Sequence, residues 1–241
     1  MTVVLKLGGS VITDKDAPET VDDDALGAAV DAVADADPER LVLVHGGGSF
    51  GHVAAADRGL SSEAGSHDAA DVWAVHDAMR RLNDAVIRRL HDAGVAALPV
   101  HPLSVAARGE ERALSLPIDS TATLLAEGFV PVLHGDVVGH AGAGATIVSG
   151  DELVTRLATR LDADRVGLCS TVSGVYDGDG SVIPGFPIWR RSPTRSETPT
   201  RLTSPAGWRR KCGRCSTSTP LPTSSVPSHC RRFWPATPRG H

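Results

Sequence analysis

The chain has 241 residues, of which 22% are charged and only 4% aromatic, and its formal net charge is −5. This length allows one domain or a tightly joined pair of domains. The sequence holds neither a run of eighteen apolar residues nor a charged and then apolar leader, so we expect a cytoplasmic protein without membrane span or secretory signal. Few aromatic residues beside abundant Ala and Val favour an α/β interior over a β-sandwich.

The net charge hides a change of composition near residue 187. Residues 1–186 hold 13 Lys and Arg against 28 Asp and Glu, whereas residues 187–241 hold 11 against 1. An acidic body whose only lysines are Lys6 and Lys15 is typical of a salt-adapted protein. We therefore predict one domain over residues 1–186 and a separate, poorly structured tail over residues 187–241.

Apolar runs and helical spacing alternate along the acidic body. The pattern predicts, in chain order, a strand at 3–7, a helix at 20–36, a strand at 41–44, a helix at 68–93, a strand at 96–100, a helix at 119–127, a strand at 130–133, a helix at 151–161 and a strand at 165–169. Apolar strands that alternate with helices predict an α/β fold with a mostly parallel, doubly covered sheet.

Two glycine-rich turns each follow a predicted buried strand. They read Lys6-Leu7-Gly8-Gly9-Ser10 and His45-Gly46-Gly47-Gly48-Ser49-Phe50-Gly51. Glycine lets a backbone approach a ligand closely, and successive N–H groups at a helix start bind anions, although such glycines also serve turns for steric reasons alone. The sequence pattern of a P-loop is absent. The glycines of the second turn have the spacing of a dinucleotide-binding motif, but the acidic residue that such a motif has about 20 residues later is missing. The two turns together favour phosphate binding.

Five polar side chains are candidates for chemistry. Lys6 and Lys15 flank the first turn and suit a phosphoryl group in transfer, although they could also be residual surface lysines. His52 ends the second turn and could donate to an acceptor phosphate or simply be solvated. Asp136 and Asp151 follow a strand and a glycine, and each could cap a helix. Asp151 could instead orient a lysine or a Mg²⁺–nucleotide.

Four segments in order resemble the amino-acid-kinase superfamily, and within it the isopentenyl phosphate kinases of archaea, including haloarchaea. These segments are Lys6–Ser10, His45–His52, Pro131–Asp136 and Ser149–Asp151. The resemblance covers about residues 2–180, and the histidine that ends the second turn is its most specific mark. It implies an open αβα sandwich, a homodimer, and ATP- and Mg²⁺-dependent phosphorylation of isopentenyl phosphate to isopentenyl diphosphate in isoprenoid biosynthesis.

The resemblance also implies roles for single residues. Lys6 and Lys15 would stabilise the transferring phosphoryl group, His52 would hold the acceptor phosphate, and Asp151 would order the lysines. The implied substrate-binding residues are Gly47, Gly48, Gly51, His52, Gly135 and Asp136, and the implied nucleotide-binding residues are Lys6, Gly8, Gly9, Ser10, Ser170, Gly174 and Tyr176. The residues implied to border the isoprenoid tail are Trp73, His76, Met79 and Leu82. No residue is expected to ligate a metal directly.

The sequence departs from the family pattern in two places. Where the family has Thr-Asp-x-Asp-Gly-Val-Tyr, residues 170–176 read Ser-Thr-Val-Ser-Gly-Val-Tyr, so two acidic residues are replaced. The later Asp-x-Thr-Gly-Gly-Met-x-x-Lys segment is absent as written. The codons from Ile188 onward can also be translated in a shifted reading frame. With mostly GC-rich codon choices, that translation restores the missing segment within an acidic, Ala-rich pattern. We therefore predict that residues from about Pro187 are out of frame.

This prediction removes two other interpretations of the tail. Cys212, Cys215 and His229 have zinc-like spacing, but Cys230 is adjacent to His229 and gives poor geometry for a fourth ligand. The Arg-rich blocks lack the interleaved structure of a nucleic-acid arm, so we expect no nucleic-acid partner. Two alternatives remain open: another phosphate- or phosphonate-accepting enzyme, similar to a fosfomycin kinase, or a catalytically impaired chain that only binds substrate.

Overall fold

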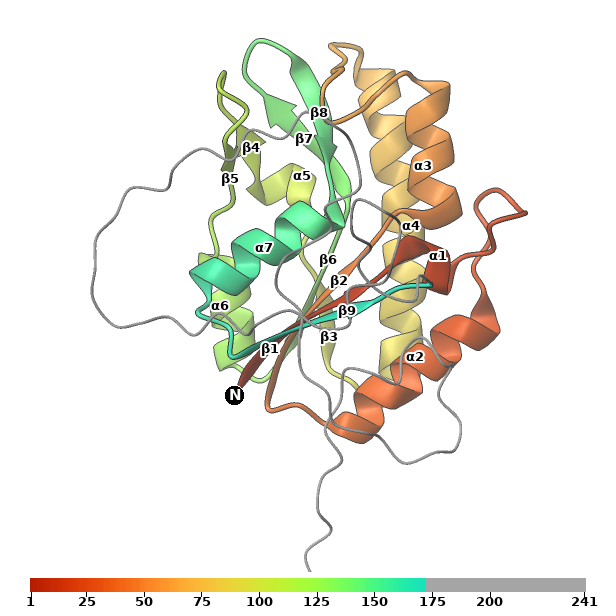
Figure 1. Cartoon of the computed structure of the whole chain (residues 1–241), viewed down its shortest axis with the longest axis vertical. Coiled ribbons are helices and arrows are strands. Elements are labelled where there is room, and N and C mark those ends of the chain that lie inside the picture. Colours follow the sequence, from red (N-terminus) through yellow and green to blue (C-terminus); the bar gives the residue numbers. More distant parts are fainter. Residues whose placement is uncertain (172–241) are drawn as a thin grey trace, which may run out of the picture.

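The computed structural model describes residues 1–171, which form two sheets with helices packed around them (Figure 1). The larger sheet has five strands in the order β3-β6-β2-β1-β9, and every neighbouring pair is parallel. Its strands are β1 (Thr2–Leu7), β2 (Arg40–His45), β3 (Ala97–Pro99), β6 (Val130–His134) and β9 (Arg165–Cys169). The predicted α/β class and its parallel central sheet are confirmed.

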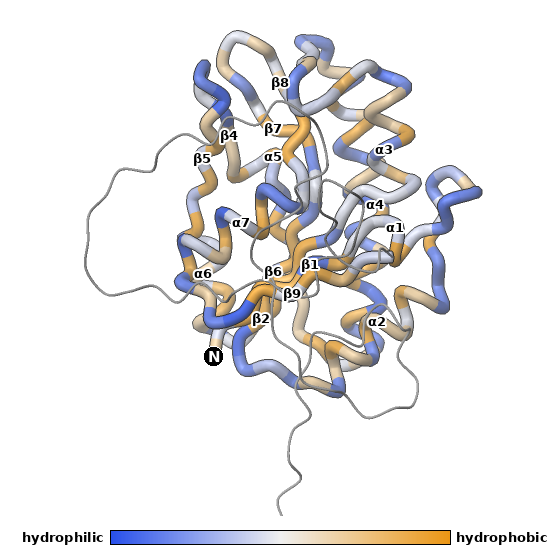
Figure 2. The backbone as a smooth tube through the Cα atoms, in the orientation of Figure 1, coloured by the Kyte–Doolittle hydropathy of each residue, from blue (hydrophilic) through white to orange (hydrophobic). Residues whose placement is uncertain are grey.

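Helices cover both faces of this sheet because the side chains of each strand alternate between two apolar clusters. Leu5 and Leu43 pack with α2 (Asp23–Ala36) and α4 (Ala69–Asp92). Val4 and Val42 pack on the other face with α6 (Asp119–Ala126) and α7 (Gly150–Arg160). Figure 2 shows the apolar strands at the centre of the molecule. Within residues 1–171, no helix combines the length and apolarity that crossing a bilayer requires.

The smaller sheet lies beyond the carboxyl end of β6 and was not predicted from the sequence. Its strands follow the order β5-β4-β7-β8, with an antiparallel β7–β8 pair. They are β4 (Ala107–Arg108), β5 (Leu114–Ser115), β7 (Asp136–His140) and β8 (Gly144–Val148). Only Gly135 separates β6 from β7, so this sheet begins directly at the end of the parallel one.

Three short helices complete the described chain. They are α1 (Gly9–Ile12), α3 (Gly48–Asp57) and α5 (Pro102–Val105). Both α1 and α3 begin inside the predicted glycine-rich turns. The parallel register pairs Leu7 with His45 and His45 with His134, so the turns after β1, β2 and β6 meet at one edge of the sheet. The predicted tail, residues 187–241, lies outside the described residues.

Candidate active site

The two glycine-rich turns pack directly against each other. A Cβ atom on Gly9 would overlap the backbone of Gly48, and one on Gly46 would lie 2.6 Å from the Gly9 nitrogen. Gly48 also has a φ of +48°, which disfavours a side chain. These glycines therefore allow the start of α1 to touch the start of α3.

Both helices that start here lack a side-chain cap. The N-cap residues of α2, α4 and α7 are Asp22, Asp68 and Ser149, and each accepts a backbone N–H. The N-cap residues of α1 and α3 are Gly8 and Gly47, which offer no such acceptor, and α5 and α6 also lack a side-chain cap bond. An uncapped helix start leaves N–H groups for an anion, and the helix dipole favours negative charge there.

The amides of the predicted glycines are not equally available. Gly8 donates its N–H to the Cys169 carbonyl at 2.8 Å, and Gly51 donates to the Gly47 carbonyl at 2.8 Å. Gly51 also lies against Met79, whose sulfur would be 2.5 Å from an added Cβ. Gly8 and Gly51 therefore serve the local structure, and a part for them in ligand binding stays a prediction.

Lys6 is held by Asp151 at this edge. The Lys6 Nζ donates to Asp151 Oδ1 at 2.8 Å, and the lysine is only 8% exposed. Asp151 lies in the first turn of α7, where the helix dipole stabilises a carboxylate. Gly150 precedes it, and an added Cβ there would lie 3.3 Å from Lys6 Cε. The structure thus places both predicted residues together, and Ser149, not Asp151, caps the helix.

Lys15 and Ser10 lie on the outer side of the first turn. Lys15 is exposed, and its Nζ donates to Thr171 Oγ1 at 3.5 Å. Ser10 Oγ lies 3.3 Å from the same oxygen. Ser170, the residue before Thr171, is half-buried. The predicted residues Gly174 and Tyr176 lie outside the described residues.

His52 is exposed on the first half of α3, four residues after Gly48. It therefore follows the uncapped start of this helix by about one turn. The contact of His52 with an acceptor stays a prediction.

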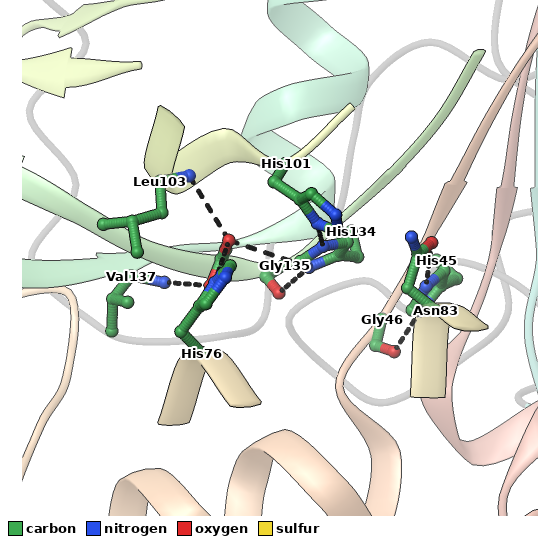
Figure 3. Close-up of polar contacts among 10 residues, drawn as sticks. His45, Gly46, His76, Asn83, His101, Leu103, His134, Gly135 and Val137 are labelled. Atoms are coloured by element: carbon green, nitrogen blue, oxygen red, sulfur yellow. Dashed lines mark hydrogen bonds and ion pairs between the residues drawn. The ribbon is translucent and has the colours of Figure 1, made fainter. Parts of the chain in front are cut away.

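Asp136 is buried and bonded to protein groups. It is 1% exposed and accepts hydrogen bonds from His76 Nδ1 at 3.0 Å, the Val137 N–H at 2.8 Å and the Leu103 N–H at 3.3 Å (Figure 3). It is the first residue of β7 and so is not the N-cap of a following helix, although the Leu103 N–H that it accepts belongs to the first turn of α5. Gly135 before it donates its N–H to the His45 carbonyl at 3.0 Å.

A group of histidines around Asp136 was not predicted from the sequence. The group consists of His45, His76, His101 and His134, whose neighbouring rings lie 5.3–6.4 Å apart. The hydrogen bond with Asp136 raises the pKa of His76. Burial lowers the pKa of His101 and of His134, and it lowers that of His45 to about 3. The repeated His-Gly pair after β2 and β6 was the available sequence signal.

A small apolar cluster lies beside this group. Leu60, Val75 and Val137 form its buried centre, and Val72 and Ile147 pack against it. The four residues implied to border an isoprenoid tail have different environments. Met79 and Leu82 are buried in the main core, His76 bonds to Asp136, and Trp73 is 58% exposed.

A second ion pair fixes the start of α7. Arg108 is 7% exposed, and its two Nη atoms donate to the two carboxylate oxygens of Glu152 at 2.8 and 2.6 Å. Glu152 directly follows Asp151, so adjacent carboxylates on one helix reach the two sheets. Within residues 1–171, no group of three or more His, Cys, Asp or Glu residues is arranged to hold a metal ion.

The chain is similar in sequence to known kinases. The amino acid kinase family model matches residues 1–190. The isopentenyl phosphate kinase of Haloferax volcanii is 69% identical over 183 residues, which cover 76% of this chain and 74% of that protein. The isopentenyl phosphate kinase of Methanocaldococcus jannaschii is 34% identical, and the match covers 73% of this chain and 71% of that protein.

Solved structures agree. A crystal structure of an isopentenyl phosphate kinase matches with a TM-score of 0.68 at 33% identity, over 73% of this chain and 74% of that one. A product complex of the Thermoplasma acidophilum enzyme matches with a TM-score of 0.65 at 32% identity, over 74% of each chain. With its paired glycine turns and its lysine held by an aspartate, this chain belongs to the amino acid kinase family and, within it, to the isopentenyl phosphate kinases.

Proposed function

We propose that this protein transfers the γ-phosphoryl group of ATP to isopentenyl phosphate, giving isopentenyl diphosphate for isoprenoid biosynthesis. The observation that carries the proposal is Lys6, held by Asp151 beside two uncapped helix starts. The 69% identity to the Haloferax volcanii enzyme supports the choice of acceptor.

The chemistry requires positioning and charge neutralisation, without a covalent intermediate. Lys6 and Lys15 would neutralise charge that develops on the transferring phosphoryl group. The N–H groups at the start of α3, from Gly47 and Gly48, would bind phosphate oxygens, and His52 would donate to the acceptor phosphate. Asp151 would hold Lys6 in place between these groups.

The apolar cluster suits the acceptor's hydrocarbon tail. Val137 directly follows Asp136 and packs with Leu60 and Val75 in this cluster. Their side chains are at most 5% exposed, so the tail would have to enter between them, and each Å² of apolar surface that it buries there would contribute about 25 cal/mol. The polar turns and the apolar cluster thus match the two ends of isopentenyl phosphate.

The described residues do not themselves supply a Mg²⁺ site. Asp151 and Glu152, the carboxylates at the start of α7, are already paired with Lys6 and Arg108. We propose that Mg²⁺ enters bound to the phosphates of ATP, which is its common mode in kinases. Ser10 and Ser170, with Gly174 and Tyr176 beyond the described residues, would contact the nucleotide.

The location, the oligomeric state and the extent of the kinase domain are also proposals. We propose a cytoplasmic homodimer whose kinase domain ends near residue 186 and whose tail is out of frame. The end of the family match at residue 190, close to the change in composition, supports this boundary.

A coupled assay of ADP release, with ³¹P NMR of the product, tests the proposal. The chain as written and a frame-restored version are each supplied with ATP, Mg²⁺ and isopentenyl phosphate, and Lys6→Met serves as the inactive control. We expect turnover by the restored version. Phosphorylation of fosfomycin, glutamate or UMP in preference to isopentenyl phosphate would contradict the proposed acceptor. Substrate binding without turnover by the chain as written would identify it as the impaired form.

A further inference from the structure

Two buried histidines make the same unusual contact at the ends of neighbouring strands. His45 Nδ1 lies 3.1 Å from the carbonyl oxygen of Gly46, the next residue in the chain. His134 Nδ1 lies 2.9 Å from the carbonyl oxygen of Gly135 in the same way (Figure 3). Both side chains are fully buried, the two residues are paired in the parallel register, and their rings stack with centroids 5.5 Å apart.

The surroundings of His45 determine which ring nitrogen carries the proton. Burial holds the pKa of His45 at about 3, so the ring is neutral at neutral pH and has one N–H and one lone pair. Because Nδ1 faces a carbonyl oxygen, the proton belongs on Nδ1. The same tautomer at His134 leaves its Nε2 to accept from the Nδ1–H of His101, which is 3.0 Å away.

Asn83, from α4, completes this arrangement at His45. Nε2 of His45 lies 3.1 Å from Oδ1 of Asn83, and the buried Asn83 Nδ2 has no partner among the described residues. With the His45 proton on Nδ1, the lone pair of Nε2 would face a lone pair of Asn83 Oδ1 in that orientation. A half-turn of the carboxamide exchanges its oxygen and nitrogen and lets Nδ2–H donate to Nε2. Asn83 then fixes the tautomer that sends the His45 proton to Gly46.

This contact also sets the direction of the next backbone N–H. The Gly46–Gly47 peptide is trans, and in a trans peptide the carbonyl and the N–H point in opposite directions. His45 holds the Gly46 carbonyl on the core side, so the Gly47 N–H points away from the core. Gly47 is the uncapped N-cap of α3, and no hydrogen bond within the described residues uses its N–H. Consecutive glycines would otherwise let this peptide rotate easily.

We propose that His45 is a positioning residue, whose Nδ1–H holds the Gly46 carbonyl and thereby keeps the Gly47 N–H turned toward a phosphate group of the ligand, with Asn83 fixing the tautomer. His45 does not touch the ligand. The inference rests on the proposed function for the identity of that ligand, a phosphate monoester or the phosphate chain of a nucleotide.

Two substitutions separate this role from simple filling of the core. In His45→Asn the side-chain NH₂ takes the place of the Nδ1–H, whereas in His45→Gln it reaches the place of Nε2 and leaves the Gly46 carbonyl unbonded. We expect His45→Asn to retain most of the affinity for isopentenyl phosphate. We expect His45→Gln to lose about tenfold to a hundredfold, the effect of one hydrogen bond to a charged group. His91→Gln is the matched control, because His91 Nε2–H bonds to the Ala97 carbonyl away from this edge and glutamine retains that donor.

The measurements are isothermal titration calorimetry with isopentenyl phosphate and ¹⁵N NMR of the wild-type chain. Long-range ¹H–¹⁵N spectra report the tautomer of His45, and the Gly47 amide resonance is followed during titration with inorganic phosphate. We expect a protonated Nδ1 and a downfield shift of the Gly47 amide proton. An Nε2–H tautomer, a Gly47 amide that phosphate does not move, or equal losses in the folded Asn and Gln variants would each overturn the inference.

The same experiments distinguish an error in the proposed role of His45 from an error in the proposed acceptor. If phosphate moves the Gly47 amide and the tautomer is as expected, but isopentenyl phosphate is not phosphorylated, the role of His45 stands and the proposed acceptor is wrong. If the variants do not fold, as judged by circular dichroism, the two wild-type NMR measurements decide the question.

Discussion

Lys6 Nζ and Asp151 Oδ1 lie 2.8 Å apart, although 145 positions separate the two residues in the chain. The contact forms because the end of β1 and the start of α7 reach the same edge of the sheet. A buried ammonium group requires a counter-charge, since an unpaired buried charge is costly. This ion pair therefore serves the fold as well as the proposed chemistry.

Replacing Asp151 tests that dual role. Asp151→Asn leaves the Lys6 ammonium without its counter-charge, so we expect a loss of about 1–3 kcal/mol in the free energy of unfolding. We also expect roughly a hundredfold slower phosphoryl transfer, because Lys6 is no longer held toward the substrate. Urea unfolding and the rate of ADP release measure the two effects. Asp119→Asn, an exposed acid in the first turn of α6, is the control, and an equal effect there would contradict the prediction.

The close approach of the glycine turns gives a second prediction. In Gly9→Ala the new methyl group meets the backbone of Gly48, so the starts of α1 and α3 must move apart. We expect at least tenfold weaker binding of isopentenyl phosphate, because the start of α3, whose N–H groups would bind the acceptor phosphate, is displaced. Gly139→Ala is the matched control, since nothing lies within 4 Å of an added Cβ there. Calorimetric titrations with unchanged affinity in Gly9→Ala would show that the close approach is unnecessary.

The Arg108–Glu152 pair should respond unequally to removal of its two partners. The Arg108 side chain is 6% exposed and that of Glu152 31%, so only the carboxylate can regain water. Glu152→Gln should therefore cost more, about 1–3 kcal/mol of unfolding free energy, than the loss of charge in Arg108→Met. Urea titrations of both variants and of the double variant provide the comparison. Equal costs would contradict the prediction, and a double variant whose cost is the sum of the two would show that the pair is not coupled.

The buried histidines predict a dependence of stability on pH. The folded pKa of His45 is about 3, below the unfolded value of about 6.5, so between these values the unfolded chain binds a proton that the folded chain excludes. This group lowers the free energy of unfolding by up to about 1.4 kcal/mol per pH unit as the pH falls below 6.5. His76 has a raised pKa and acts in the opposite direction: its stabilisation is present below its unfolded pKa and is lost as the pH rises through the folded value.

The variant His45→Asn isolates the contribution of His45. Its free energy of unfolding, measured by urea titration between pH 7 and pH 5, should fall less steeply than that of the wild type. Parallel curves for the two proteins would contradict the prediction. The same pair of proteins is used in the binding experiment, so folding and phosphate affinity are compared on identical samples.

The sequence was sufficient for the parallel sheet because its strands are buried on both faces. Such strands, β2 for example, are continuous apolar runs. In the smaller sheet, β4 and β5 were missed because they have two residues each and show no alternation, so their pairing depends on the tertiary arrangement. Helix α3 was also missed, because the glycines at its start oppose a helix in isolation.

The candidate site was predictable only in part. Lys6 and Asp151 could be chosen from the motifs, and the structure brings them together. The role of His45 could not be inferred, because it depends on a contact with the next carbonyl and on Asn83 from a distant helix. A histidine next to glycines reads as part of a loop, and only the parallel register reveals its pairing with His134.

The first turn of α7 carries two carboxylates that differ by one position and reach different sheets: Asp151 bonds to β1 and Glu152 to β4. Consecutive residues of a helix point about 100° apart, so this division depends on the number of residues that follow the cap. Removing or adding one residue between Ser149 and Glu152 would turn the wrong carboxylate toward Lys6 while leaving both acids in the sequence. The length of this segment is therefore constrained as strictly as its composition, and a conservative-looking insertion there would be more damaging than many substitutions.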